Sequence, residues 1–192
     1  MNDKNKVMHM MLGSKAFSDI ERDPHDYYAT SPKALELIID ELDLSENVWE
    51  CACGGGHLSR VLEEHGHNVK STDLYYNGYG RGGVDFLKQT EKYDGDILTN
   101  PPYKYAKEFV EKALELTDGK VVMLLKITFL EGKARRKLFA DCPPKYVYVS
   151  SSRLQCAKNG DFDTYTNSTA LCFCWFVWEK GFAGEPTIRW FN

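Results

Sequence analysis

Residues 96–103, Asp96-Ile97-Leu98-Thr99-Asn100-Pro101-Pro102-Tyr103, decide how this chain folds. The apolar run has the length of a buried strand, and two prolines end it because proline cannot donate to a β-ladder. Apolar residues then recur at helical spacing: Tyr105, Ala106, Phe109, Val110, Ala113 and Leu114. The stretch therefore predicts a strand, a tight turn and an amphipathic helix, with Asn100 to Tyr103 at the carboxyl end of the strand.

Strand and helix patterns alternate on both sides of this unit. We expect strands at 47–52, 68–73, 93–99, 120–127, 145–150 and 170–178, with a short strand-like piece at Val84. Helices are expected at 31–42, 58–65, 105–114 and 130–140. Residues 186–192 either add an edge strand or pack their apolar side chains. Strands separated by helices predict an α/β fold with a mostly parallel seven-stranded sheet and helices on both faces.

Unusual residues follow several of the predicted strands. They are Gly54 to Gly56, Asp73, Asp85 and Asn100 to Tyr103. Because open parallel sheets bind ligands outside the carboxyl ends of their strands, these residues predict one shared site at that edge. An acid of a plain surface turn is the alternative for Asp73, and the ligand-binding interpretation is favoured over it. A helix cap followed by a core aromatic is the alternative for Asp85 and Phe86.

The tetrapeptide Asn100 to Tyr103 also has a chemical interpretation. The Asn100 side-chain carbonyl and the Pro101 backbone carbonyl are two hydrogen-bond acceptors. Together they suit an amino group conjugated to a ring, because holding both N–H groups favours a nitrogen whose lone pair can attack. The Tyr103 ring offers a stacking face for a planar group. An ordinary chain turn is the alternative, and the context favours the chemical interpretation.

Composition limits the possible classes of protein. The chain has 192 residues, of which 43% are hydrophobic, and a net charge of −4. This is typical of one globular domain, and the absence of a long apolar run or signal pattern predicts a cytoplasmic protein without a membrane partner. A negative charge does not favour nucleic-acid binding, so any such contact must be local. Lys133 to Lys137 are one candidate cluster, although a solvated helix face is the simpler interpretation.

Six cysteines are present, two pairs of them spaced C-x-C. Neither pair has a histidine at metal-ligand spacing, so we expect reduced structural thiols packed as small apolar groups, and no metal.

At these residues the chain resembles the amino-methyltransferases of DNA, especially adenine-N6 enzymes of the small bacteriophage and prophage type. The resemblance covers about residues 27–178. It rests on Asn-Pro-Pro-Tyr after an apolar strand, on the glycine turn after Glu50, and on Tyr28 to Pro32 before the first helix. It implies a single Rossmann-like methyltransferase domain at 27–192, with residues 1–26 as an N-terminal arm.

The resemblance implies S-adenosylmethionine as the cofactor and assigns residues to it. Asn100, Pro101, Pro102 and Tyr103 would be catalytic. The cofactor would contact Tyr28, Thr30, Pro32, Glu50, Ala52, Cys53, Gly54, Gly56, His57, Asp73, Leu74, Asp85, Phe86 and Asn100. Among these, Asp73 would hold the ribose, and Asp85 with Phe86 the adenine.

The implied partner is double-stranded DNA with its target base flipped out. We expect no separate target-recognition domain, so recognition would come from loops or from a second subunit, and a homodimer is compatible. Candidate substrate-binding residues are Tyr103, Arg81, Arg153, Lys158, Phe162 and Tyr165; ordinary loop packing explains the last two aromatics equally well.

Three other functions stay open. The same tetrapeptide serves enzymes that methylate a protein glutamine, although those usually carry an additional N-terminal domain. RNA adenine is a further substrate for this chemistry. A cofactor-binding protein without catalysis is the non-enzymatic alternative, and the intact Asn100 to Tyr103 motif weighs against it.

Overall fold

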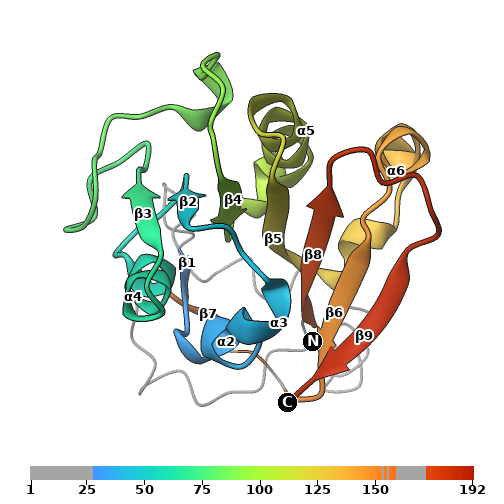
Figure 1. The fold of residues 1–192 in the computed structure, drawn as a ribbon, viewed down its shortest axis with the longest axis horizontal. Helices are drawn as coiled ribbons and strands as arrows, with labels where there is room; N and C mark the ends of the chain where they lie inside the picture. The colour runs from blue at the N-terminus through green and yellow to red at the C-terminus, as the bar shows by residue number, and fades with distance from the viewer. Residues whose placement is uncertain (1–27, 153, 155, 159–171) are drawn as a thin grey trace, which may run out of the picture.

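The strand predicted at 93–99 is observed at 96–99, as the third strand of a seven-stranded sheet (Figure 1). A computed structural model describes residues 28–152, 154, 156–158 and 172–192 of the chain. The strand order is β3-β2-β4-β5-β8-β6-β9. The strands are β2 (Asn47–Glu50), β3 (Asn68–Ser71), β4 (Asp96–Thr99), β5 (Lys120–Lys126), β6 (Tyr146–Ser150), β8 (Phe173–Glu179) and β9 (Thr187–Phe191).

Most neighbouring strands run parallel, as predicted. β2 is parallel to β3 and β4, β4 is parallel to β5, and β6 is parallel to β9. β8 is antiparallel to both β5 and β6, between which it is inserted. Its residues Phe173 to Trp178 are all buried, as the unbroken apolar run requires of a strand covered on both faces.

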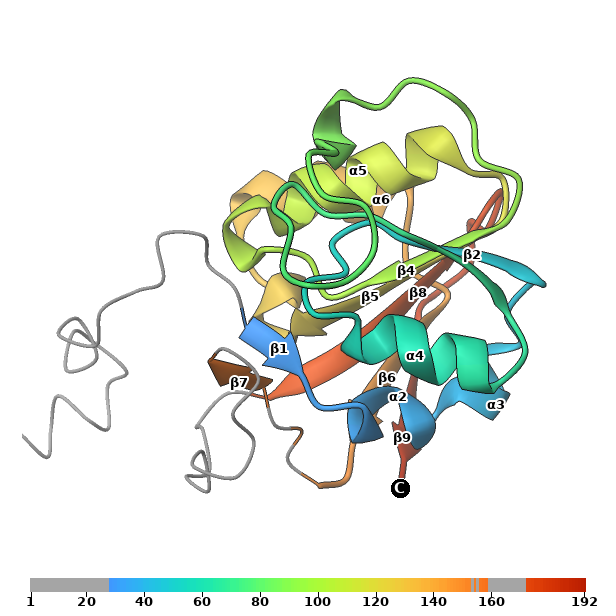
Figure 2. The same cartoon turned by 90° about the vertical axis from the view of Figure 1, so that its left-hand side faces the viewer.

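Helices cover both faces of the sheet (Figures 1 and 2). One face packs against α2 (Lys33–Glu36), α3 (Ile39–Leu42) and α4 (His57–Glu64), and the other against α5 (Ala106–Leu116) and α6 (Arg136–Asp141). Along β5, Val122 and Leu124 point to the first core and Val121, Met123 and Leu125 to the second. The period of two in a strand thus builds two hydrophobic cores from one apolar segment.

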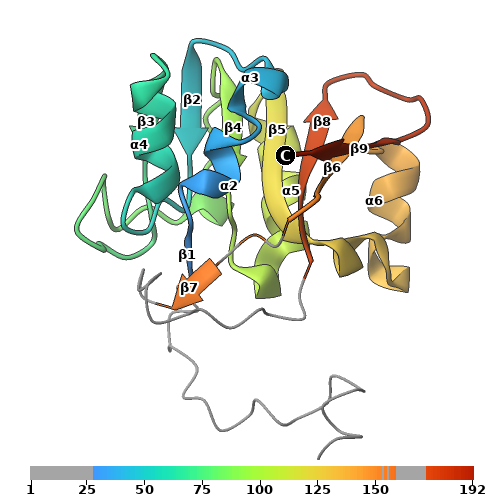
Figure 3. The ribbon, with the colours of Figure 1, turned by 90° about the horizontal axis from the view of Figure 1, so that it is seen from below.

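A second, two-stranded sheet lies at the carboxyl edge of the main one (Figure 3). β1 (Tyr28–Thr30) pairs antiparallel with β7 (Cys156–Lys158). The segment after β1 is tied to the main sheet, because the Trp175 indole donates a hydrogen bond of 2.8 Å to the Ala34 carbonyl. β1 therefore brings Thr30 to the edge where the predicted site residues lie.

Two predicted helices are shorter than their patterns suggest. The first divides into α2 and α3 because the backbone leaves the helical region at Ile38 (φ −135°), which lets the adjacent Ile38 and Ile39 both be buried. The predicted basic helix at 130–140 is wrong in its first half. Gly132 has φ +108°, which a helix does not allow, so only short turns, η3 (Ile127–Leu130) and η4 (Lys133–Arg135), precede α6.

The predicted strand-like piece at Val84 is wrong. Val84 lies in a loop before the short turn η1 (Phe86–Lys88), and its N–H donates to the Asp73 carbonyl. The seventh strand is β9 instead, which confirms the edge-strand interpretation of 186–192. Of its apolar side chains only Phe191 is buried, whereas Ile188 and Trp190 are 52% and 68% exposed.

Free thiols are found at Cys51, Cys53, Cys142, Cys172 and Cys174. Cys51, Cys53 and Cys174 are buried, as expected of small apolar groups. Cys172 is exposed because it precedes β8 rather than lying within it, so the prediction that it packs in the core is wrong.

Candidate active site

A cavity of about 520 Å³ opens at the carboxyl edge of the sheet. This volume lies within the roughly 300–1,000 Å³ of typical ligand pockets. It is formed by the loops after β2, β3 and β4 together with the end of β1. Its lining comprises Thr30, Glu50, Cys51, Ala52, Cys53, Gly54, His57, Leu58, Asp73, Leu74, Tyr75, Asn77, Val84, Asp85, Phe86, Leu87, Asn100, Pro101, Pro102, Tyr103, Lys104, Tyr105 and Phe109. The glycine turn and the Asn100 to Tyr103 turn therefore share one cavity.

Asn100 is oriented by a hydrogen bond to Thr30, which lies 70 residues earlier in the sequence. Its Nδ2 donates to Thr30 Oγ1 at 2.7 Å. The carbonyl oxygen, Asn100 Oδ1, is buried and has no hydrogen-bond partner among the described residues. Buried polar atoms are nearly always paired, so an unpaired acceptor on a cavity-lining residue indicates a place for a donor from a ligand.

Tyr103 begins the short turn η2 (Tyr103–Tyr105) and is half-buried. Its ring stacks on Phe173 with the centroids 5.6 Å apart. The Lys126 ammonium lies 4.6 Å from the centroid of the same ring. Because one aromatic and one cation hold it, the ring has a fixed position at the wall of the cavity.

The glycine turn after β2 needs glycine at two positions. Gly54 and Gly56 have φ of +52° and +78°, where L side chains are strained. The Gly54 N–H donates to Asp73 Oδ2 at 2.8 Å, which joins the turn to the end of β3. A Cβ at Gly56 would lie 2.3 Å from the Tyr79 ring, so that ring can cover the turn only because no side chain is there.

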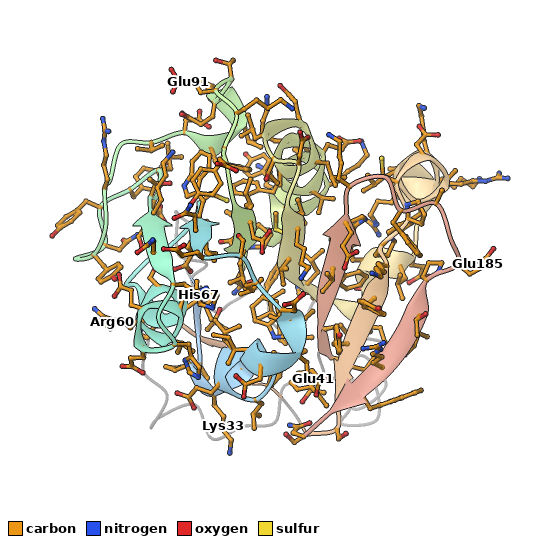
Figure 4. The ribbon with its side chains drawn as sticks, viewed as in Figure 1. Lys33, Glu41, Arg60, His67, Glu91 and Glu185 are labelled. Atoms are coloured by element: carbon orange, nitrogen blue, oxygen red, sulfur yellow. The ribbon has the colours of Figure 1, made fainter. Side chains whose placement is uncertain are left out.

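Tyr79 clamps the glycine turn from outside. Its hydroxyl donates to Glu63 Oε1 at 2.6 Å, and the Arg60 guanidinium lies 4.6 Å from its ring centroid. Arg60, on the outer side of α4 (Figure 4), also donates to the Gly55 carbonyl at 2.9 Å. Partial burial and the Glu63 carboxylate raise the pKa of Tyr79 to about 12. The phenol thus stays a hydrogen-bond donor, and the turn is held from two sides.

Glu50 is the most strongly perturbed acid of the cavity. Its side chain is 2% exposed, and the Ser59 hydroxyl donates to it while lying 2.7 Å from the Ser71 hydroxyl. Burial raises the Glu50 pKa from 4.5 to about 8, and the negative charges of Asp73 and Glu63 add to the increase. A cationic partner beside Glu50 would favour its ionised form and so offset the cost of burying the carboxylate.

Asp73 and Asp85 both combine a local structural role with a place in the lining. Asp73 accepts backbone N–H groups from Gly54 and from Tyr75, the latter at 2.9 Å. Asp85 caps η1 by accepting from the Leu87 N–H at 3.2 Å. The cap interpretation of Asp85 is therefore confirmed, and lining the cavity does not conflict with it.

Phe86 likewise serves the core and the cavity. It is 2% exposed and packs on Trp49 and Phe109 with centroid distances of 5.3 and 5.1 Å. This packing is that of a core aromatic, and the same residue lines the cavity.

Most residues that the sequence assigned to catalysis or to a cofactor line this cavity, although their roles stay predictions. Pro32 and Gly56 do not line it, Gly56 because Tyr79 covers it. The backbone of Tyr28 lies in β1, and its side chain is outside the description.

The predicted substrate residues are less well placed. Arg81 is exposed and does not line the cavity, because its backbone is tied to β3 through Ser71 and Asp73. Lys158 lies in β7, described by its backbone alone. Arg153, Phe162 and Tyr165 lie outside the described residues.

The sequence missed several residues of the lining. Leu58, Val84, Leu87 and Phe109 supply apolar walls, and Lys104 and Tyr105 lie in the turn that follows a predicted strand. Tyr75 and Asn77, which also line the cavity, belong to the loop 75–83 that the sequence indicates as a candidate recognition surface. The strand-end rule could have found the loop residues. The packing of Phe109 could not have been found, because helical spacing says only that it is buried.

Neither a metal-binding cluster nor a helix long and apolar enough to cross a membrane is found in the described residues.

Comparison with known proteins identifies the fold. No family model and no curated protein matches the chain. A candidate RNA methyltransferase from Pyrococcus horikoshii has a similar structure, with a TM-score of 0.60, 15% identity and coverage of 94% of this chain and 98% of that one. The magnesium protoporphyrin IX methyltransferase of Synechocystis PCC 6803, solved with bound S-adenosylmethionine, matches at 0.52 and 15% identity over 94% and 98% of the two chains.

A dimethyladenosine transferase from Plasmodium falciparum is also similar, with a TM-score of 0.53 and 17% identity over 80% of this chain and 62% of that one. At such identities the likeness concerns the fold. The chain has the Rossmann-like α/β fold of the S-adenosylmethionine-dependent methyltransferases.

Proposed function

We propose that this protein transfers a methyl group from S-adenosylmethionine to the N6 amino group of adenine in DNA. The observation that carries the proposal is the buried, unpaired Oδ1 of Asn100 on the wall of the cavity. A carbonyl in that position accepts a hydrogen bond from an amine, and the adjacent Pro101 carbonyl belongs to the same turn.

The residues of the cavity fit the cofactor. Glu50 offers a carboxylate for the cationic amino-acid end, and Asp73 offers carboxylate oxygens for ribose hydroxyls. Phe86 and Phe109 supply an apolar wall for the adenine ring. Gly54 brings the backbone close without a side chain. When bound, the cofactor supplies an electrophilic methyl group on sulfur.

The chain's own part in the reaction is positioning. Thr30 fixes the Asn100 amide so that Oδ1 takes one N–H of the target amine, while the Pro101 carbonyl takes the other. With both hydrogens held, the nitrogen would be pyramidal and its lone pair available to the methyl group that the bound cofactor would supply; the thioether would be the leaving group, and one of the two held protons would be lost to solvent. Preorganised dipoles of this kind need no reorganisation during reaction and no side chain with a tuned pKa.

The aromatic wall supports a base taken out of a duplex. Tyr103 is fixed beside Asn100 by Phe173 and Lys126, and Tyr105, 43% exposed, lies at the mouth of the cavity. A flipped base has two apolar faces, and aromatic side chains are its usual contacts.

RNA adenine is the second candidate. One protein with a similar fold is named a dimethyladenosine transferase. The amino group of adenine in RNA would be held by the same two acceptors, Asn100 Oδ1 and the Pro101 carbonyl. Methylation of a protein glutamine uses the same chemistry, since that amide nitrogen is also conjugated.

A substrate panel tests the proposal. The protein is incubated with radiolabelled S-adenosylmethionine and, separately, duplex DNA, single-stranded DNA, RNA or a protein extract, and the labelled atom is identified by mass spectrometry. We expect N6-methyladenine in duplex DNA. Label found only in RNA, or only on protein glutamine, would identify that molecule as the substrate in place of DNA. The absence of label from every acceptor would overturn the proposed activity.

A further inference from the structure

Positive charge is concentrated in the segments that follow β4 and β5. Residues 100–107 contain two lysines and no acid, and residues 126–137 contain five lysines and arginines and one glutamate. The two segments together carry a local charge of +6 in a chain whose net charge is −4. The rest of the sequence therefore carries a net charge of −10, which favours approach of an anionic polymer to these two segments.

These segments lie side by side at the carboxyl edge of the sheet. Figure 3 shows the turns after β4 and β5 at the same end of the molecule as β1 and β7. Lys126, the last residue of β5, places its ammonium 4.6 Å from the Tyr103 ring centroid. The basic segment thus begins in contact with the proposed catalytic turn.

Some of these cations serve the fold. The Arg135 guanidinium donates to the backbone carbonyls of Phe129, Thr128 and Glu131, and so fixes the turn between η3 and η4. Lys137 pairs with Asp141, and Lys107 pairs with Glu111. Arg135 is therefore engaged with backbone carbonyls, and the charges of Lys137 and Lys107 are neutralised by carboxylates.

Three exposed cations differ from them. Lys104, Lys133 and Arg136 are exposed, and none forms an ion pair with a carboxylate in the described part of the chain. Ile127 and Leu130 lie between them in the sequence and are 38% and 44% exposed. Lys133 and Arg136 flank Arg135, which holds the backbone of this segment in place, and Lys104 lies in the turn after β4. Exposed lysine and arginine side chains are the usual partners of nucleic-acid phosphates.

We propose that this edge docks the phosphate backbone of duplex DNA, with Lys104, Lys133 and Arg136 contacting phosphates beside the extruded base. The identity of the polymer rests on the proposed function. Such contacts fix the position of the duplex over the cavity and carry no base sequence, because phosphates are the same at every step. Three neutralised phosphates weaken binding as salt rises, with a slope of about −2.7 in the logarithm of the association constant against the logarithm of the salt concentration.

The test compares two charge-matched double variants. Lys133→Gln/Arg136→Gln removes two cations of the surface. Lys92→Gln/Lys180→Gln removes two exposed lysines. Lys92 precedes β4 and Lys180 follows β8, so both lie at the opposite end of the sheet. Fluorescence anisotropy with a labelled 20-base-pair duplex gives Kd at several salt concentrations, and calorimetry gives the affinity for S-adenosylmethionine.

We expect the first variant to bind the duplex about tenfold or more weakly, to lose about 1.8 from the salt slope, and to keep its cofactor affinity. The control should bind DNA like the unchanged protein. Equal DNA affinity and equal KM for DNA in both variants, with methylation intact, would overturn the docking surface and leave the function standing. If the unchanged protein neither binds nor methylates DNA, the DNA substrate itself is wrong. If Lys133→Gln/Arg136→Gln weakened the binding of RNA and left the binding of DNA unchanged, RNA would be the partner of this surface.

Discussion

Glu50 makes the free energy of unfolding depend on pH, and one substitution should remove that contribution. With a pKa near 8 in the fold and an ordinary value of 4.5, this carboxyl prefers to stay protonated when buried. Because the folded pKa is the higher one, its contribution to stability is fully present below pH 4.5 and is lost as the pH rises through 8. The full difference of pKa corresponds to roughly 5 kcal/mol, and the part lost between pH 5 and pH 9 is about 4 kcal/mol.

Glu50→Gln keeps the shape of the side chain and cannot ionise. In the absence of ligand, we expect the free energy of unfolding of the variant to exceed that of the unchanged protein increasingly from pH 5 to pH 9, by about 4 kcal/mol over that range. Urea denaturation of both proteins at pH 5, 7 and 9 measures this difference, and contributions from other titrating groups cancel in the comparison.

Glu64→Gln, on the exposed side of α4, is the matched control and should follow the unchanged protein. If Glu50→Gln and the unchanged protein lost stability in parallel across this pH range, Glu50 would not be a buried carboxyl with a raised pKa, and its place in the site would have to be revised.

The affinity for S-adenosylmethionine should rise with pH up to about 8, by up to about tenfold per pH unit, because a cationic ligand group requires ionised Glu50; calorimetry that finds a flat profile would contradict this. Tyr79→Ala should weaken cofactor binding roughly tenfold by releasing the glycine turn, an energy of about 1.4 kcal/mol, whereas Tyr79→Phe should stay near the unchanged value because the ring remains. Equal losses in both variants would assign the effect to the hydroxyl. Gly56→Ala should lower the free energy of unfolding by about 2 kcal/mol or more, measured in urea, since it combines a positive φ with a Cβ against the Tyr79 ring; unchanged stability would mean that the ring does not cover the turn.

The sequence predicts the fold where one physical rule dominates. Pro101 and Pro102 end β4, β5 is a nearly continuous apolar run after Gly119, and α5 has a clear apolar stripe, so these three elements follow from sequence pattern. The edge at which the polar residues gather follows from the parallel connections.

Where two rules compete, the sequence prediction fails. Residues 130–140 have a helical composition, but Gly132 and the carbonyl contacts of Arg135 fix a turn in their middle. The strand expected at Val84 gives way to a loop because the Asp73 carbonyl takes its N–H.

The site was predictable as a set of residue types but not as a geometry. Asn100 and the glycine turn could be found from their place after strands. The hydrogen bond that aims Asn100 comes from Thr30, 70 residues earlier, and depends on β1 pairing with β7. The burial of Glu50 and the clamp by Tyr79 likewise need the tertiary structure, because each arises from several elements meeting.

Methyl transfer by Asn100→Ala tests the central claim most directly. The variant and the unchanged protein are given labelled S-adenosylmethionine and duplex DNA, and N6-methyladenine is counted by mass spectrometry while calorimetry measures cofactor affinity. We predict a 10²–10³-fold slower transfer, about 3–4 kcal/mol of lost transition-state stabilisation, with cofactor affinity nearly unchanged. An Asn100→Ala protein that methylates adenine at the normal rate would contradict the account.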